Sequence, residues 1–203
     1  MGEVLYVAAV AEELGPLDGE ALGIGLVAAT AGAARLCAER RPAAVVLVGT
    51  AGAFPGADGI PIGAVVVGTS LVLGAPAVLL GLGYQPSPPP SLLADPALTG
   101  AMIHAGAVPA AVLTQLAITT DPDLAARLGV EWGVEHMEAY GVAWACHAAG
   151  VPFVAVLGIT NGVGPDAHAQ WRAHRSGAEA SARDVAVHGM AAVRAMAARG
   201  WAG

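Results

Sequence analysis

Residues 134–164, VEHMEAYGVAWACHAAGVPFVAVLGITNGVG, hold the pattern that decides the fold. Within this stretch, residues 138–149 predict an apolar helix, and Gly150 favours the left-handed backbone that often closes a helix. Residues 152–159 follow as an apolar, β-branched run, which is typical of a strand buried on both faces. A helix that leads directly into such a strand predicts a fold in which helices cover a central sheet.

Two polar side chains flank this helix and strand. Glu138 stands at the predicted helix start, and Asn161 comes just after the predicted strand. A carboxylate and an amide that meet at a cleft can hold a sugar hydroxyl and the edge of a purine. Each residue also has an ordinary interpretation, because acidic residues are common at helix N-termini and an Asn-Gly pair is a frequent turn.

The rest of the chain alternates between predicted strands and predicted helices. The predicted strands are residues 4–10, 21–27, 43–49, 62–72, 77–82, 110–116 and 152–159. The predicted helices are residues 28–41, 95–106, 121–128, 138–149 and 178–198. Strands that are apolar on both faces need cover on both sides, so we predict an α/β fold with a mixed central sheet in a three-layer α/β/α sandwich. We expect one domain over residues 1–203, since no clear linker or repeat interrupts the chain.

Small and acidic residues follow two of the predicted strands, and ligands bind α/β sheets where strands end. Thr50-Ala51-Gly52 predicts a turn whose backbone amides can approach a ligand closely, although a simple turn explains it equally well. Glu12 and Glu13 follow the first strand. They are candidates for a general base, and an acidic first helical turn is the simpler interpretation.

Three further side chains give weaker signals. Met137 is suited to packing on a sugar or to filling the core. Trp171 is suited to walling a pocket or to anchoring a helix. His136 has no partner that spacing suggests, and we interpret it as a surface histidine or one whose hydrogen bonds are satisfied inside the protein.

The charge balance limits the kinds of partner. The formal net charge is −7, which argues against nucleic-acid binding and favours a small molecule. The chain contains no lysine, which excludes Schiff-base chemistry and a P-loop lysine. Cys37 and Cys146 stand in apolar segments and predict buried free thiols, and no Cys/His spacing predicts a metal site. We therefore expect neither a metal nor a cofactor.

The apolar composition, with 56% hydrophobic residues, does not predict a membrane protein. Gly, Pro or polar residues interrupt each apolar run before it reaches the length that spans a bilayer. The N-terminal stretch that starts at Met1 lacks the basic region of a signal peptide, so we expect a cytoplasmic protein without membrane contact. Such a composition also suggests a buried subunit interface, and we expect a homodimer or a higher homo-oligomer.

Five short segments together point to a family. They are residues 8–13, 23–27, 49–52, 134–139 and 158–164. In this order they resemble the nucleosidase branch of the purine nucleoside phosphorylase superfamily. Residues 49–54 and 158–164, followed by Gln170-Trp171, are most similar to the futalosine hydrolases of that branch, which cleave hypoxanthine from futalosine in menaquinone biosynthesis. The resemblance implies an N-glycosyl hydrolase that takes a nucleoside, futalosine, and water.

Other functions within this fold stay open. The resemblance also extends to methylthioadenosine/S-adenosylhomocysteine nucleosidases and other purine nucleosidases. Leu157 stands where relatives usually carry Arg, and Ala64 stands where they usually carry Asp. These departures leave room for a non-catalytic nucleoside-binding relative.

The resemblance assigns roles to individual residues. It places the water-activating glutamate at Glu13, with Glu12 as the alternative, and the residue that faces purine N7 at Asn161. Met137 and Glu138 correspond to the pair that binds ribose. The other implied substrate-binding positions are Thr50, Ala51, Gly52, Ala117, Ile118, Thr119 and Thr160.

Asn161 distinguishes between purines. Methylthioadenosine/S-adenosylhomocysteine nucleosidases carry Asp at this place, and an acid can protonate N7 of adenine. An amide can instead donate to O6 of hypoxanthine while its carbonyl accepts from protonated N7. Adenine presents an amino donor in place of O6, and a mismatched buried polar group costs about 1–3 kcal/mol. Asn161 therefore predicts a 6-oxopurine leaving group.

The positions of the arginines favour hydrolysis over phosphorolysis. The related phosphorylases hold phosphate with arginines near the first strand and the Gly-rich turn. In this chain no Arg precedes Arg35, and none lies between Arg41 and Arg127. A phosphate without such charge-assisted partners would be poorly held.

Overall fold

The computed structural model describes residues 2–56 and 59–198, which leaves Met1 outside the described residues. Its strands are β1 Val4–Ala8, β2 Gly19–Ala21, β3 Ala44–Ala53, β4 Val65–Leu73, β5 Leu92–Leu93, β6 Val108–Thr114, β7 Val134–His136 and β8 Phe153–Gly162. Its helices are α1 Ala11–Leu14, α2 Leu26–Arg40, α3 Pro76–Leu79, α4 Pro96–His104, α5 Pro122–Leu128, α6 Ala139–Ala149 and α7 Ala167–Ala198.

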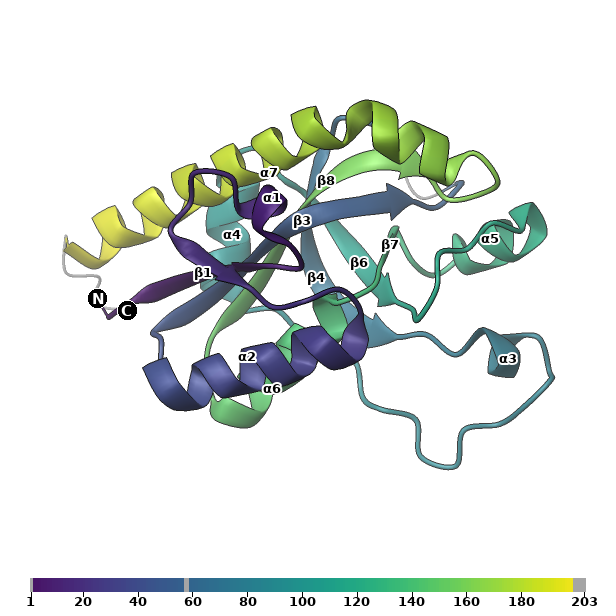
Figure 1. Ribbon diagram of the computed structural model, residues 1–203, viewed down its shortest axis with the longest axis horizontal. Coiled ribbons are helices and arrows are strands. Elements are labelled where there is room, and N and C mark those ends of the chain that lie inside the picture. Colours follow the sequence, from purple (N-terminus) through teal and green to yellow (C-terminus); the bar gives the residue numbers. More distant parts are fainter. Residues whose placement is uncertain (1, 57–58, 199–203) are drawn as a thin grey trace.

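The long strand β3 organises the sheet. Its first half lies between β1 and β8, both parallel to it, and its last residues also pair with β7, which is antiparallel. From β8 the pairing continues through β4 and β6 to β7, and β7 returns to β3. The sheet is therefore mixed, and five of its strands close into a ring (Figure 1).

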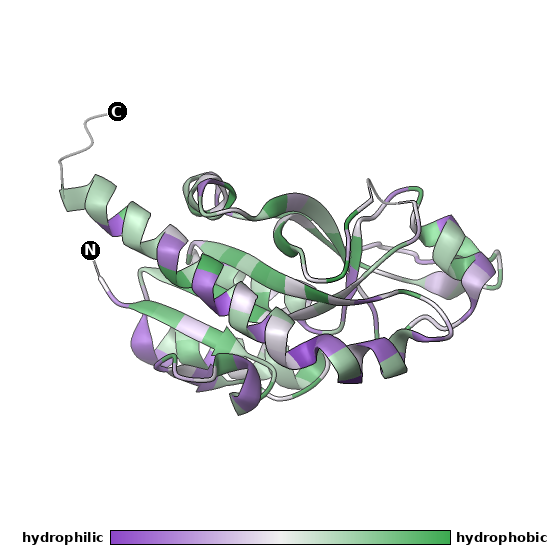
Figure 2. Cartoon of the chain, turned by 90° about the horizontal axis from the view of Figure 1, so that it is seen from above, coloured by the Kyte–Doolittle hydropathy of each residue, from purple (hydrophilic) through white to green (hydrophobic). Residues whose placement is uncertain are grey.

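Helices cover the sheet on two sides. Helices α2 and α6 pack together on one side, and α7 packs on β8 and β3 on the other, with α4 beside it (Figure 1). Side chains alternate along β3: Val45 and Leu47 belong to the core under α2 and α6, whereas Val46 and Val48 belong to the core under α4 and α7. Figure 2 accordingly shows apolar strands inside, with hydrophilic residues gathered on the helices.

The prediction of a mixed α/β fold with a central sheet and flanking helices is confirmed. The structure differs from the predicted three-layer sandwich in one respect, because the ring of pairings through β7 bends the central sheet into a barrel-like shape. β7 was not predicted, since its three residues, Val134, Glu135 and His136, do not form an apolar or alternating run.

Two predicted strands are wrong. Residues 21–27 contain only the end of β2, because Gly23 and Gly25 adopt positive φ angles of 100° and 87° and the helix α2 starts directly afterwards. Residues 77–82 begin as the short helix α3, which Pro76 starts as its first residue. In both segments apolar composition alone did not separate strand from helix or loop.

Three boundaries also differ from the predictions. Thr50-Ala51-Gly52 is not a turn, because β3 continues to Ala53 while it pairs with β8 and β7. Asn161 lies inside β8, and not beyond its end. The C-terminal helix begins at Ala167, eleven residues before the predicted start at residue 178. The sheet thus carries its polar residues within the strands, where pairing fixes their positions.

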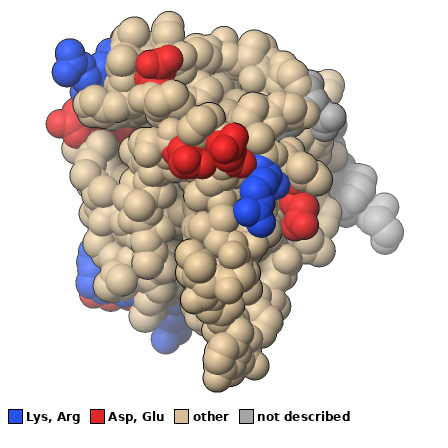
Figure 3. All heavy atoms as spheres, turned by 90° about the vertical axis from the view of Figure 1, so that its right-hand side faces the viewer, with Lys and Arg blue, Asp and Glu red and all other residues tan. Residues whose placement is uncertain are grey.

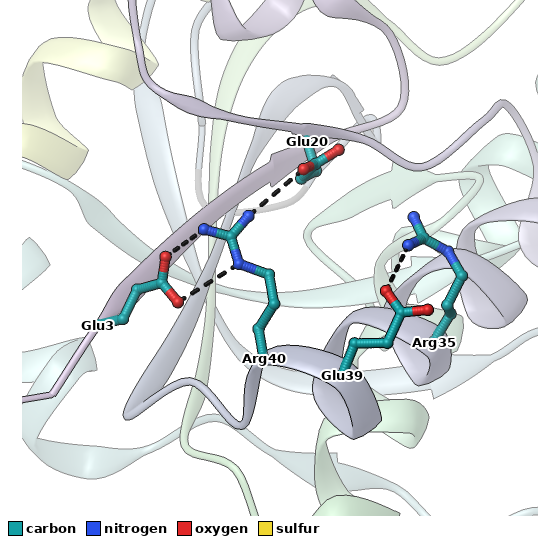
Figure 4. A network of polar contacts seen from close by, with 5 residues as sticks. All are labelled: Glu3, Glu20, Arg35, Glu39 and Arg40. Carbon is teal, nitrogen blue, oxygen red and sulfur yellow. Dashed lines mark hydrogen bonds and ion pairs between the residues drawn. The ribbon is translucent and has the colours of Figure 1, made fainter.

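Helix α7 approaches β8 very closely. A Cβ placed on Gly158 would lie 2.2 Å from the backbone oxygen of Ala178, so only glycine fits at this crossing. The far edge of the sheet carries an ion-pair network in which Arg40, at the end of α2, contacts Glu3 and Glu20 (Figure 4). Across residues 2–56 and 59–198, no helix has both the length and the hydropathy needed to cross a bilayer.

Candidate active site

A cavity of about 270 Å³ lies beside the C-terminal halves of β3 and β8. The predicted site residues that line it are Glu13, Thr50, Ala51, Gly52, Ile118, Met137, Glu138, Thr160 and Asn161. Two do not: Ala117 is exposed outside the lining, and the buried Thr119 lies behind it. Most side chains on the face to which β3 and β8 point are uncharged, and its charged side chains are mainly acidic (Figure 3).

The carboxylate of Glu13 is partly buried at the cavity wall. Its Oε2 accepts a hydrogen bond from the N–H of Ala9 at 3.1 Å. Burial and the nearby negative charge of Glu138 raise the pKa of Glu13 to about 7, although backbone hydrogen bonds from Val10 and Ala9 oppose the shift. A carboxyl with such a pKa can exchange a proton near neutral pH. Glu12, the alternative, is exposed and does not line the cavity.

Glu138 is buried, lines the cavity and bonds to a distant segment of the chain. Its Oε1 accepts from the N–H of Gly25 at 2.7 Å, just before α2 begins. Gly25 can present this N–H because its φ of 87° suits glycine. The neighbouring Met137 lines the cavity beside it. One carboxylate oxygen is thus anchored to the protein.

His136 is buried in the cavity wall, although its spacing in the sequence indicated no partner for it. Its Nδ1 accepts from the backbone N–H groups of Glu138 and Ala139, each at 3.0 Å. Burial lowers the pKa of His136, against the opposing effect of Glu138. The 3.3 Å contact from Nδ1 to Glu138 Oε2 is therefore not an ion pair, because an Nδ1 that accepts two hydrogen bonds carries no proton.

Asn161 holds its side-chain amide in one orientation. Its Oδ1 accepts from the hydroxyl of Thr160 at 2.7 Å, and its Nδ2 donates to the backbone oxygen of Gly162 at 3.1 Å. A bulge between Ala51 and Gly52 brings Gly52 opposite Asn161, and a Cβ on Gly52 would lie 2.7 Å from Nδ2. The oriented amide keeps one lone pair and one N–H for a ligand.

A second buried carboxylate supports the segment around Ile118. Glu135 accepts hydrogen bonds from the side chain of Gln115 at 2.5 Å and from the backbone N–H of Thr119 at 3.0 Å. Burial raises the pKa of Glu135, and hydrogen bonds from Thr119 and Gln115 oppose this effect. Sequence reasoning missed Glu135 because only the pairing of β7 with β6 turns it toward this loop.

The first turns of α7 form another wall. Trp171 lines the cavity, and its Nε1 donates to the hydroxyl of Thr50 at 3.3 Å. The ring of His168 stacks on Trp171 with centroids 5.7 Å apart, and the Arg175 guanidinium lies 5.0 Å from the Trp171 ring. The indole of Trp171 therefore forms part of the pocket wall, which was one of the two interpretations of this residue from the sequence.

Comparison with known proteins identifies the family. Residues 8–197 match the phosphorylase superfamily. This chain belongs to the phosphorylase superfamily. A curated member, the futalosine hydrolase of Streptomyces coelicolor, is 35% identical over 141 residues, which cover 63% of this chain and 57% of that protein. The match thus extends over little more than half the length of this relative.

Solved structures share the fold of this phosphorylase-superfamily chain. The 5'-methylthioadenosine/S-adenosylhomocysteine nucleosidase of Neisseria meningitidis, in complex with methylthio-immucillin-A, has a TM-score of 0.80 at 20% identity and covers 94% of this chain and 99% of its own. The native futalosine hydrolase of Helicobacter pylori has a TM-score of 0.78 at 18% identity and covers 92% and 97%. At such identities the likeness extends to the fold.

Proposed function

We propose that this protein hydrolyses the N-glycosidic bond of futalosine and releases hypoxanthine and dehypoxanthine futalosine, a step of menaquinone biosynthesis. The observation that carries the proposal is the convergence of Glu13, Glu138 and the oriented amide of Asn161 on one cavity. The 35% identity to the Streptomyces enzyme supports the choice of substrate.

The proposed mechanism assigns one task to each of the three side chains. The C1′–N9 bond stretches first and gives an oxocarbenium-like sugar. As the bond breaks, N7 of hypoxanthine takes a proton from solvent water, and Asn161 donates to O6 and accepts from the resulting N7–H. Glu138 accepts hydrogen bonds from ribose hydroxyls beside Met137, and Glu13 takes the proton of the attacking water, a contribution of roughly 10²–10⁴-fold.

The walls of the cavity support hydrolysis over phosphorolysis. None of the described residues that line it is an arginine, and the chain has no lysine. A phosphate ion bound there would lose its hydration without gaining a cationic partner, and this desolvation costs free energy. A water molecule is uncharged and does not incur that cost. Backbone positions Thr50, Ala51 and Gly52 would face the sugar and base, with Ile118 and Thr160 completing the pocket.

We further propose that the chain is a single nucleosidase domain with three α/β/α layers, whose central sheet closes into a ring. We also propose that it acts in the cytoplasm as a homodimer or higher homo-oligomer. The family match over residues 8–197 supports the single domain. Exposed apolar side chains at the cavity, Ile24 and Ile118, together with the exposed Leu116, support a covered surface in an oligomer.

Incubation with futalosine, inosine and methylthioadenosine, followed by chromatography of the free bases, tests the proposal. We expect hypoxanthine from futalosine in the absence of phosphate. Release of adenine but not hypoxanthine would contradict the substrate and favour a methylthioadenosine/S-adenosylhomocysteine nucleosidase. Thermal stabilisation by futalosine without any base release would indicate a binding protein.

A further inference from the structure

The two ring nitrogens of His136 serve different purposes. Nδ1 accepts the N–H groups of Glu138 and Ala139 and thereby caps the start of α6, where the Glu138 side chain makes no capping bond. An imidazole whose Nδ1 is an acceptor carries its hydrogen on Nε2. His136 therefore presents an Nε2–H donor to whatever lies beyond the ring.

The space beyond Nε2 is the space above Gly49. A Cβ placed on Gly49 would lie 3.5 Å from His136 Nε2 and 3.2 Å from Glu13 Oε1. Within residues 2–56 and 59–198, no side chain or backbone group forms a hydrogen bond with this Nε2. Nε2 is also not among the fully buried polar atoms that lack a partner, so it is open to the cavity. Because glycine leaves the space open, both groups can reach one small molecule there.

A water molecule fits the chemistry of this space. When ionised, the carboxylates of Glu13 and Glu138 can only accept hydrogen bonds, so neither can donate one to a lone pair of the water. We propose that the Nε2–H of His136 orients the water that Glu13 deprotonates in the hydrolysis proposed above, on which this inference rests. One water lone pair accepts from His136, and the other faces C1′.

The proposed step balances without a change at His136. The C1′–N9 bond breaks and its electron pair leaves with the base, and the water oxygen then forms a bond to C1′ of the oxocarbenium-like sugar. The water proton passes to Glu13, and His136 keeps its own proton throughout. His136 contributes orientation, which lowers the entropic cost of reaching the reactive geometry.

A matched pair of substitutions separates this role from the capping role. Asn in place of His136 keeps an amide oxygen near the position of Nδ1 but has no group near Nε2. Gln places an amide nitrogen near the position of Nε2 but loses the acceptor near Nδ1. We expect His136→Asn to lower kcat roughly tenfold with KM and Tm little changed.

We expect His136→Gln to recover most of that kcat, even though loss of the cap lowers its Tm by roughly 2–4 °C. If kcat were instead lower in His136→Gln than in His136→Asn, in parallel with Tm, His136 would have only a structural role. A loss confined to KM would assign the Nε2–H to a ribose hydroxyl and overturn the proposal. His147→Asn, on the exposed side of α6, is the control and should change neither quantity.

One measurement does not depend on turnover. Long-range ¹H–¹⁵N correlation spectra of the histidine rings should show His136 as the Nε2–H tautomer at neutral pH. An Nδ1–H tautomer or a charged ring would overturn the inference. If the wild type released no base from any purine nucleoside, the proposed function would fail, whereas full activity of His136→Asn would defeat only the role of His136.

Discussion

Glu13 is the residue whose chemistry depends most on its surroundings. Burial of its carboxyl and the like charge of Glu138 together raise its pKa to about 7. Only the ionised form can accept a proton from water. The acidity of a single side chain therefore determines the pH range in which the proposed reaction runs.

The pH dependence of the rate follows from this pKa. We expect kcat/KM for futalosine to rise with pH and to reach half its maximum near pH 7, because kcat/KM reports the free enzyme. Glu13→Gln should lower kcat by at least roughly 10²-fold and leave no such rise. A rise centred near the ordinary pKa of 4.5 would mean that Glu13 is not the base.

The same pKa predicts a pH-dependent stability. The pKa of Glu13 is about 7 in the folded protein and 4.5 ordinarily, so the folded state holds the proton more tightly. The resulting stabilisation is complete below the ordinary value and is lost as pH rises through the folded value. The Tm of Glu13→Gln relative to wild type should therefore increase between about pH 5 and about pH 8. A constant difference in Tm would contradict the shifted pKa.

Asn161→Asp tests the choice of purine. An acid at this position can protonate N7 of adenine but no longer donates an amide N–H to O6 of hypoxanthine. We expect kcat/KM to fall about tenfold or more for futalosine and to rise for methylthioadenosine, measured with both substrates under the same conditions. Asn161→Ala, which removes both functions, should be slow with both. Unchanged selectivity in Asn161→Asp would place base recognition elsewhere.

The candidate site was only partly predictable from the sequence. Glu13, Glu138 and Asn161 stand beside long apolar segments, whose strands and helices fix their approximate place. Glu135 and His136 belong to the short strand β7, which exists because β6 and β3 pair with it. Contacts between distant segments decide the roles of these two residues, and local patterns carry little trace of them.

At the scale of elements, α7 and β8 meet through their backbones. Gly158→Ala would place a methyl group 2.2 Å from the backbone oxygen of Ala178, so the helix must move away from the strand. We expect a loss of stability of about 1–3 kcal/mol in urea denaturation. Gly177→Ala is the matched control, because its Cβ meets no atom within 4 Å. It should stabilise α7 by up to about 1 kcal/mol. Equal stabilities of the two variants would contradict this close packing.

The elements themselves were predictable where apolar runs were long. The buried strands β3, β4, β6 and β8 and helices α2 and α6 were all anticipated within a few residues. The two wrong strand predictions fell where glycine or proline turns an apolar segment into a loop or a helix, as at Gly23 and Pro76. Closure of the sheet was not predictable, since it depends on which distant strands pair.

At the scale of the whole molecule, surface charge contributes little to stability. Arg40 joins α2 to Glu3, just before β1, and to Glu20 in β2, and these side chains are 37%, 45% and 43% exposed (Figure 4). We expect Arg40→Ala to lower the stability only slightly, and by less at high salt. Urea denaturation at two ionic strengths measures this. A larger loss that salt does not reduce would show that Arg40 acts through packing of its side chain.

The closed ring of strands has a consequence for synthesis on the ribosome. β3 ends at Ala53, but its parallel partner β8 begins only at Phe153. A growing chain therefore carries β3, which is apolar on both faces, through about half of its synthesis without the strand that covers its edge. Such unpaired edges favour aggregation. We expect the nascent protein to need chaperones or rapid late folding, since the core under α7 is complete only after Met190 has emerged.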